Sequence, residues 1–145
     1  VIQRVSKATV IIDDMIYSSI NEGILLLVGI ADNDNDSQLI YYTKKIVNMR
    51  IFNDSNGKMN RSLLDIKGSI LVVSQFTLCA NTKKGNRPSY MCAANPDHAH
   101  SLYQALIQEL KNYEINVKKG RFGAHMKLDI INDGPVTILL GENYG

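Results

Sequence analysis

The sequence contains no tryptophan and only two cysteines and three prolines among its 145 residues. Two cysteines are too few for a disulfide framework, so we interpret Cys79 and Cys92 as reduced thiols. The sequence also lacks both an apolar run of membrane-spanning length and a signal-peptide pattern, which predicts a soluble, cytoplasmic protein without a membrane segment. A net charge of +2 is far too small for a protein that coats duplex nucleic acid.

Common catalytic and cofactor motifs are missing as well. We find no G-x-S-x-G nucleophile elbow, no glycine-rich phosphate loop followed by Lys-Ser/Thr, and no G-x-G-x-x-G dinucleotide motif. The three histidines are His98, His100 and His125, and their spacing from Cys92 matches no known zinc ligand set. The sequence therefore predicts neither a metal nor a cofactor.

The length and the 45% hydrophobic content predict one domain, spanning residues 1–145, with one sizeable core. Two continuous apolar runs, 24–30 and 69–73, predict strands that are covered on both faces. Helical periodicity predicts one helix from Asp36 or Ser37 to about Arg50, and a second helix after Pro96. Weaker patterns predict strands at 1–5, 8–12, 126–131 and 136–140. The expected fold is α+β, with mixed or antiparallel sheets forming a barrel-like core and two main helices packed on it.

The stretch NDGPVTILL places a Gly-Pro pair, Gly134-Pro135, directly before an apolar β-branched segment. Glycine tolerates positive φ and close backbone approach, while proline fixes φ and has no N–H group. Together they predict a rigid turn with bare main-chain groups. This turn is either the tip of a hairpin between 126–131 and 136–140 or a working surface.

Hydroxyl and amide side chains follow the predicted strand 69–73, in the segment Ser74-Gln75-Phe76-Thr77. Polar groups at the end of a core strand are well placed to offer rigid hydrogen-bond donors to a ligand. Alternatively, Ser74 and Thr77 cap the strand while Phe76 fills the core. Cys79 is either a nucleophile paired with a histidine or, more commonly for its position, a small buried hydrophobe.

Positive charge is concentrated in two clusters, 83–87 (KKGNR) and 118–122 (KKGRF). Each combines two lysines, a glycine and an arginine in a predicted loop, and the second adds an aromatic ring. Such loops can bind phosphates while the ring stacks on a base. The alternative is that both are merely solvated surface loops.

Several stretches, taken in their order along the chain, resemble the D-aminoacyl-tRNA deacylase family, formerly called D-tyrosyl-tRNA deacylase. The resemblance covers the sequence nearly end to end. Its two signature stretches are SQFTL at 74–78 and NDGPVT at 132–137. The other matching segments are VIQRVSKATV, LLVGI, RIFNDSNGKMNRSLLD, LVVSQFTLCANTKKGNRPSY and GRFGAHMKLDIINDGPVTILL.

The resemblance implies an enzyme that hydrolyses the ester between a D-amino acid and the 3′ terminal adenosine of tRNA, releasing both. It implies a homodimer in which Gly134-Pro135, joined by a cis peptide bond, enters the partner's pocket and faces the chiral centre. Rigid main chain there would clash with an L side chain and leave a D side chain free. Glycine has no side chain to clash, so glycine mischarged on alanine tRNA is an expected second substrate.

By the same resemblance, Ser74, Gln75, Phe76 and Thr77 are the expected catalytic residues. Backbone N–H groups around Gln75, Phe76 and Thr77 are candidate donors to the developing oxyanion. Thr77 is either the nucleophile or a group that positions the substrate while the ribose 2′-hydroxyl assists water. We favour the second role because no histidine or carboxylate lies near Thr77 in sequence.

The resemblance also assigns the tRNA contacts. Phe122 and Met126 are expected to flank the terminal adenine. The expected phosphate contacts are Lys83, Lys84, Arg87 and Arg121.

Two other functions remain open at this point. A non-catalytic RNA-binding module would explain the basic clusters but not the Gly-Pro turn. A general hydrolase of small esters or amides, using Ser74 or Thr77, would act without tRNA and without a preference for D-amino acids.

Overall fold

The computed structural model describes residues 1–142, so the last three residues of the predicted domain, 143–145, lie outside it. Its large sheet consists of β1 (Ile2–Ile12), β2 (Met15–Ile20), β3 (Gly23–Val28), β6 (Ser69–Ser74), β7 (Asn116–Lys119) and β8 (Lys127–Ile138). The helices and helical turns are η1 (Asp36–Gln38), α1 (Leu39–Asn48), α2 (Leu63–Ile66), η2 (Phe76–Cys79) and α3 (Pro96–Lys111). A separate ribbon pairs β4 (Phe52–Asn53) with β5 (Met59–Arg61).

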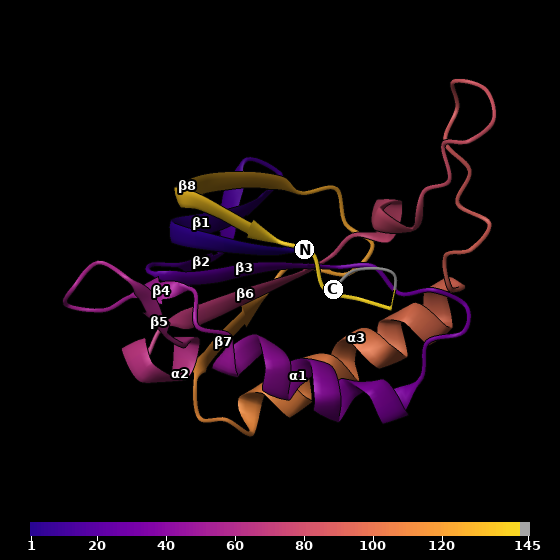
Figure 1. Ribbon diagram of the computed structural model, residues 1–145. Helices are drawn as coiled ribbons and strands as arrows, with labels where there is room; N and C mark the ends of the chain where they lie inside the picture. The colour runs from indigo at the N-terminus through magenta and orange to yellow at the C-terminus, as the bar shows by residue number, and fades with distance from the viewer. Residues whose placement is uncertain (143–145) are drawn as a thin grey trace.

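The sheet has the strand order β2-β1-β3-β6-β7, and β8 pairs with β1. Strands β3, β6 and β7 run parallel to one another, whereas β1 is antiparallel to its neighbours β2, β3 and β8. The Ser18 Oγ donates to the Lys119 carbonyl oxygen at 2.8 Å, which connects β2 to β7. The sheet therefore curls into a nearly closed barrel, with α1 and α3 on its outside (Figure 1), and the predicted fold class is confirmed.

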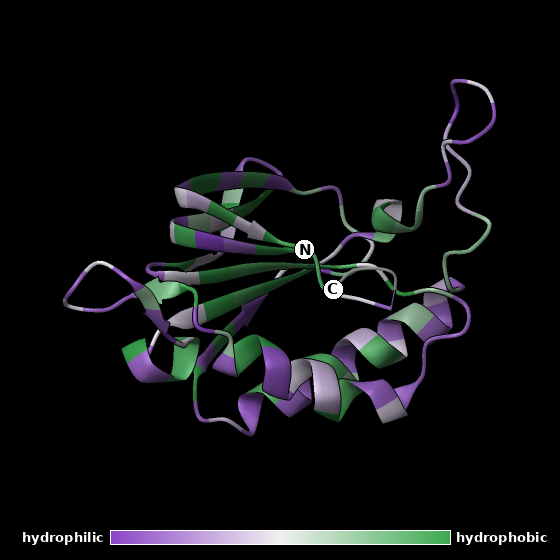
Figure 2. Cartoon of the chain, viewed as in Figure 1, coloured by the Kyte–Doolittle hydropathy of each residue, from purple (hydrophilic) through white to green (hydrophobic). Residues whose placement is uncertain are grey.

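Two apolar clusters lie on opposite faces of the central strands β3 and β6. Ile24 and Leu26 of β3 pack with Ile70 and Val72 of β6 beneath the two long helices. Leu25 of β3 faces the barrel interior instead. Because both faces are covered, these strands carry the continuous apolar runs visible in Figure 2. The two predicted core strands are confirmed.

Asn35 caps the helical turn η1, which runs directly into α1, and Asn95 caps α3; α1 itself begins after Gln38 without a side-chain cap. The Asn35 side chain accepts from Ser37 N ahead of α1, and the Asn95 side chain accepts from His98 N at 2.9 Å ahead of α3. Each helix directs its apolar stripe toward the sheet, and the buried residues of α3 are Leu102, Tyr103, Leu106, Ile107 and Leu110. The two predicted helices are confirmed, with α1 ending at Asn48.

Several strand predictions were incomplete. The segments 1–5 and 8–12 form one strand, β1, which bends at Ser6 and Lys7, the two consecutive exposed residues in its middle. Neither β2 nor β7 was predicted. Lys118 and Lys119 lie in β7 rather than in a loop, because Val117 alone of this short polar strand packs inward.

The predicted hairpin at the NDGP turn was wrong. Residues 127–138 form the single strand β8, and both of its halves pair with β1. Ile131 lies opposite Lys7 and Thr137 lies opposite Gln3, so the intervening residues bulge outward where β1 itself bends. The Gly134–Pro135 peptide bond within this bulge is cis, as the resemblance implies.

Candidate functional site

The Ser74–Thr77 segment begins where β6 ends. Ser74 is the last residue of β6, and the Gln75 N–H donates to the Val28 carbonyl oxygen at the end of β3, 2.7 Å away. Helical turn η2 follows at once. The segment therefore lies at the carboxyl ends of parallel strands, the edge at which open α/β sheets commonly bind ligands.

Close packing against Gly29 fixes the position of this turn. A Cβ atom added to Gly29 would lie 2.9 Å from Leu78 Cβ and 3.3 Å from the Gln75 carbonyl oxygen. Real Cβ contacts are not this short, so any side chain at Gly29 would push the turn away from β3. Gly29 was not among the predicted site residues, although a glycine that ends an apolar strand is a signal of close backbone approach.

The exposed side of the turn presents a hydroxyl group and main-chain N–H groups. Phe76 and Thr77 are exposed, and the Gln75 side-chain amide donates to Thr77 Oγ1. The N–H groups of Phe76 and Thr77 open a 3-10 turn that has no side-chain cap, so they have no acceptor within the turn. In residues 1–142, Gln75 is the one side chain that hydrogen-bonds to Thr77, so no general base is positioned there.

Phe122 and Met126 lie just beyond β7, next to the end of β6. The Gly120 N–H donates to the Val72 carbonyl oxygen at 2.9 Å, which aligns the two strand ends. Phe122 stacks on His100 of α3, with ring centroids 4.7 Å apart. Met126 packs so closely on Gly120 that a Cβ atom there would lie 2.7 Å from its sulfur. The structure thus brings this pair to the same edge as Ser74.

The first basic cluster lies on an arm that projects from the body of the protein (Figure 1). Isolated bridges between Ala31 and Ala93 and between Asn81 and Ser89 hold its base. Figure 2 shows that the outer part of this arm is hydrophilic, and Lys83, Lys84 and Arg87 of the arm are all exposed. Arg121 is exposed on the body after β7, so the two predicted clusters occupy separate surfaces.

The Gly134–Pro135 bulge is held by a buried cation, Arg4 of β1. The Arg4 Nε donates to the Asp133 carbonyl oxygen at 3.0 Å and lies 3.8 Å from the Asp133 carboxylate. Its Nη1 donates to the Ile51 carbonyl oxygen at 2.8 Å. Gly134 has φ +120°, and a Cβ atom there would lie 2.8 Å from Arg4 Nη2. Glycine is therefore required on both conformational and steric grounds.

Sequence reasoning missed Arg4, although the pattern contained a signal. Arg4 is 7% exposed and follows Ile2 by two residues, so both lie on the same buried face of β1. A charged residue in that register needs partners. Here three carbonyl oxygens from two segments supply them: that of Asp133 in β8, and those of Ile51 and of the Asn53 side chain at β4.

The structure does not bring Gly134 and Ser74 together within one chain. Gly134 lies beside Arg4, which pairs with Ile24, which in turn pairs with Ile70. Ser74 is four residues farther along β6, or roughly 13 Å along the strand direction. In Figure 1, accordingly, the bend of β8 and the turn after β6 lie at opposite ends of the sheet.

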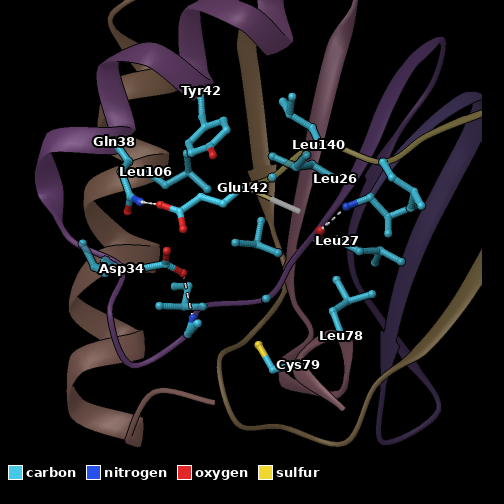
Figure 3. A pocket seen from close by; sticks show the side chains of 18 of the residues that line it. Leu26, Leu27, Asp34, Gln38, Tyr42, Leu78, Cys79, Leu106, Leu140 and Glu142 are labelled. Atoms are coloured by element: carbon cyan, nitrogen blue, oxygen red, sulfur yellow. Dashed lines mark hydrogen bonds between the residues drawn. The ribbon is translucent and has the colours of Figure 1, made fainter. Parts of the chain in front are cut away.

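A cavity of about 480 Å³ lies behind the turn, between β3, α1 and the last described residues (Figure 3). Asp34 and Glu142 face it, but Asp34 accepts from Ala31 N and Glu142 accepts from the Gln38 amide, each at 2.7 Å. Burial raises the pKa of the Cys79 thiol, and Asp34 adds to this effect. Cys79 is therefore not an activated thiolate nucleophile, and none of Ser74–Thr77 lines the cavity.

The histidines serve separate purposes. His98 Nε2 is 2.8 Å from the Asp34 carbonyl oxygen, whereas His100 stacks on Phe122. Within residues 1–142, no three His, Cys, Asp or Glu side chains gather in an arrangement that could hold a metal ion.

None of the helices in this part of the chain has the length and apolar character that crossing a membrane requires.

The fold and the strand-end site define a class of mixed α+β proteins with a barrel-like sheet, and solved structures of this class match closely. The structure titled "c-Myc DNA Unwinding Element Binding Protein" superposes with a TM-score of 0.91 at 39% identity, covering 97% of this chain and 96% of that one. A structure titled as a probable eukaryotic D-amino acid tRNA deacylase gives a TM-score of 0.80 at 16% identity, covering 92% and 93%. At that identity it supports the fold alone.

Sequence comparisons identify the family. Residues 1–141 match the family model described as D-Tyr-tRNA(Tyr) deacylase. The D-aminoacyl-tRNA deacylase of Thermosipho africanus (strain TCF52B) is 50% identical over 140 residues, which cover 97% of this chain and 94% of that protein. The chain belongs to the D-Tyr-tRNA(Tyr) deacylase family, a family of hydrolase enzymes, and the predicted resemblance is confirmed.

Proposed function

We propose that this chain hydrolyses the ester of D-aminoacyl-tRNA, releasing free tRNA and a D-amino acid, at the exposed side of the Ser74–Thr77 turn. The observation that carries the proposal is the pair of N–H groups at Phe76 and Thr77, which open an uncapped turn at the end of β6. Family membership supports the same reaction. We place the activity in one domain, residues 1–145, in the cytoplasm, where aminoacyl-tRNA is used.

In our proposed mechanism, water attacks the ester carbonyl carbon. The new C–O bond forms while the N–H groups of Phe76 and Thr77 stabilise the oxyanion. When the tetrahedral intermediate collapses, the ester bond breaks and the ribose oxygen leaves with a proton, while the attacking water becomes part of the released acid. The Gln75 N–H already donates to Val28 and is not available as a third donor.

We assign Thr77 a positioning role. Its hydroxyl is held by the Gln75 amide, which cannot accept a proton as a general base. The neighbouring ribose 2′-hydroxyl of the substrate would then assist the attacking water.

We further propose that the working form is a homodimer. The Gly134–Pro135 bulge and the Ser74–Thr77 turn lie at opposite ends of one sheet, so a single chain cannot present both to one ester. A second copy, related by two-fold symmetry, could place its bulge over the first copy's turn. Gly134 and Pro135 are both exposed, as this arrangement requires.

In this dimer, the bulge would reject L-amino acids by steric conflict. Arg4 fixes the main chain at Asp133 and Gly134, so the wall facing the chiral centre is rigid. A thousandfold preference for the D-ester requires only about 4 kcal/mol. Because rejection needs a side chain, glycine mischarged on alanine tRNA would also be a substrate.

We propose that the acceptor end is held by two kinds of contact. Phe122 and Met126 would flank the terminal adenine, since they lie at the same strand edge as Ser74. Phosphate contacts would come from the exposed cations of the arm and of the loop after β7. These are Lys83, Lys84, Arg87 and Arg121.

The first test is a time course of hydrolysis with purified protein on D-tyrosyl-tRNA and L-tyrosyl-tRNA in parallel. We expect rapid loss of the D-ester while the L-ester persists. Equal loss of both would indicate an unselective esterase, which would also cleave small chromogenic esters. Binding of tRNA without loss of either ester would indicate an RNA-binding module.

The dimer is tested separately by sedimentation and by dilution. We expect a species of twice the chain mass, and a specific activity that falls when dilution dissociates it. A monomer that retains full activity at every concentration would contradict the cross-subunit site.

A further inference from the structure

Three aromatic rings meet where α3 passes the ends of β6 and β7. His100 and Phe122 are stacked, with ring centroids 4.7 Å apart and an interplanar angle of 23°. Tyr103 lies 5.7 Å from Phe122 at an angle of 45°. His100 and Tyr103 are three residues apart on α3, so they contact Phe122 from the same side.

Tyr103 also connects α3 to both strand ends. Its ring is 2% exposed, and its hydroxyl donates to the Val72 carbonyl oxygen at 2.8 Å. The same hydroxyl is 3.4 Å from the Gly120 carbonyl oxygen. Val72 precedes Ser74 by two residues, and Gly120 precedes Phe122 by two residues. The Tyr103 hydroxyl thus adds a side-chain bridge to the direct hydrogen bond from the Gly120 N–H to the Val72 carbonyl oxygen, and it supports the spacing between the Ser74–Thr77 turn and the Phe122 loop.

We propose that His100 and Tyr103 are positioning residues that hold Phe122 as a preformed stacking surface for the terminal base of the acceptor end. The inference rests on the proposed function, in which Phe122 contacts that base. His100 packs flat on one face of the ring, so the ring cannot turn without losing this contact. A surface ordered before binding costs less to occupy than one that must be ordered by the substrate.

The two residues contribute differently. His100 is exposed in the second turn of α3, and its side chain makes no hydrogen bond within residues 1–142, so its contribution is the ring stack itself. Tyr103 is buried, and its contribution is the hydroxyl bridge. A phenyl ring at position 100 would keep the stack, whereas a phenyl ring at position 103 would keep the packing and remove only the bridge.

Steady-state hydrolysis of D-tyrosyl-tRNA tests the role of His100. We expect His100→Ala to raise KM about two- to tenfold with kcat unchanged, the range expected for one aromatic pair. His100→Phe should restore KM, because it keeps the stacked ring. The matched control is Gln108→Ala, an exposed residue two turns farther along α3, which should leave KM unchanged.

An unchanged KM in His100→Ala, or no restoration in His100→Phe, would overturn the proposal. Tyr103→Phe should also raise KM, and if it instead lowered only thermal stability, the positioning role of Tyr103 would be refuted. If wild-type protein hydrolyses no D-ester at all, the proposed function fails first, which the same assay reveals.

A second measurement does not depend on activity. The imidazole C–H resonances of His100 should be shifted upfield in NMR spectra by the Phe122 ring current, and Phe122→Leu should remove that shift. Adding adenosine monophosphate as the probe should shift the His100 resonances further in wild-type protein but not in Phe122→Leu. Identical His100 resonances in wild-type and Phe122→Leu protein would show that the stack does not form.

Discussion

The Ser74–Thr77 turn after β6, where we propose that hydrolysis occurs, and the bulge of β8 are built in opposite ways. At the turn, Phe76 and Thr77 are exposed, and the functional groups are main-chain N–H donors that await a ligand. At the bulge, the main chain is tied by the buried Arg4 to Asp133 and Ile51. The turn therefore leaves its hydrogen-bond donors accessible to a substrate, whereas the bulge is held rigidly enough to exclude a side chain by steric conflict.

This difference suggests a division of work between two copies of the chain. A rigid wall and an open turn are complementary, yet about four residues of strand separate them within one chain. In the proposed dimer, each copy would use its open end for hydrolysis and lend its rigid end for selection. Changes at the two ends should then alter different parameters, kcat at one and the D/L ratio at the other.

The largest effect is expected from Arg4→Ala. Loss of the buried guanidinium leaves the Asp133 and Ile51 carbonyl oxygens without their donor, so we expect the free energy of unfolding to fall by about 2–4 kcal/mol. The bulge should then give way to L side chains, and the D/L ratio of hydrolysis rates should fall from about a thousandfold toward tenfold. Urea denaturation and parallel D- and L-tyrosyl-tRNA assays measure the two effects.

Two further variants control this result. Lys7→Ala changes an exposed cation on the same strand and should leave both quantities unchanged. Arg4→Lys keeps the charge but cannot reach all its acceptors with one ammonium group, so it should lose selectivity with a smaller loss of stability. A full D/L ratio in Arg4→Ala would show that Arg4 does not fix the wall.

The next effect in size is expected from Gly29→Ala, at the other end of the sheet. The added Cβ would lie 2.9 Å from Leu78 Cβ, so the turn must move away from β3. We expect a loss of stability of about 1–3 kcal/mol, typical of overpacking. We also expect kcat to fall about tenfold, since displaced oxyanion donors lose transition-state stabilisation, while the D/L ratio stays the same.

Gly57→Ala is the matched control for Gly29→Ala. Gly57 has φ +76° with nothing within 4 Å of an added Cβ, so the change introduces backbone strain without touching the turn. It should lower stability and leave kcat unchanged. If Gly29→Ala instead changed the D/L ratio, the separation of the two functions would be broken.

The contrast between the two ends also explains what the sequence could predict. The continuous apolar runs of β3 and β6 and the apolar periodicity of the two long helices are local patterns, and each was predicted correctly. The hydroxyl and amide groups after β6 could be placed at a strand end for the same reason. The main-chain hydrogen bond from the Gln75 N–H to the Val28 carbonyl oxygen could not be predicted, because it joins two strands that are far apart in the sequence.

Structure that depends on distant partners was missed. Strand β7 buries only Val117, and its lysines point to solvent, so no alternating pattern marks it. Strand β2 follows a tight turn at Asp13 and Asp14, both with positive φ, a turn usually marked by Asn-Gly or Asp-Gly. The bulge was taken for a hairpin tip because nothing local reveals that both halves of β8 pair with the bent β1.

A smaller effect is expected from Thr77→Ala. If Thr77 only positions the substrate, removing its hydroxyl costs about one hydrogen bond, and kcat should fall about two- to tenfold. Thr77→Ser should be close to wild type. Single-turnover hydrolysis of D-tyrosyl-tRNA by the wild type and the two variants measures this decrease in rate. Complete loss of hydrolysis in Thr77→Ala with tRNA binding intact would instead identify Thr77 as the nucleophile.

The smallest effect is expected from the basic arm. Lys83 and Lys84 lie at the tip of a projecting loop, where each can neutralise at most one phosphate and is well screened. Each change to alanine should therefore reduce the slope of log affinity for tRNA against log salt by about 0.7–0.9. At physiological salt, KM should rise only a few-fold, with kcat and the D/L ratio unchanged. Lys45→Ala, an exposed cation of α1 on the outside of the barrel, is the control and should leave the slope unaltered. Equal slopes for wild type, Lys83→Ala and Lys84→Ala would show that these lysines of the arm do not contact the phosphate backbone, and would leave Arg121 as the proposed phosphate contact that lies outside the arm.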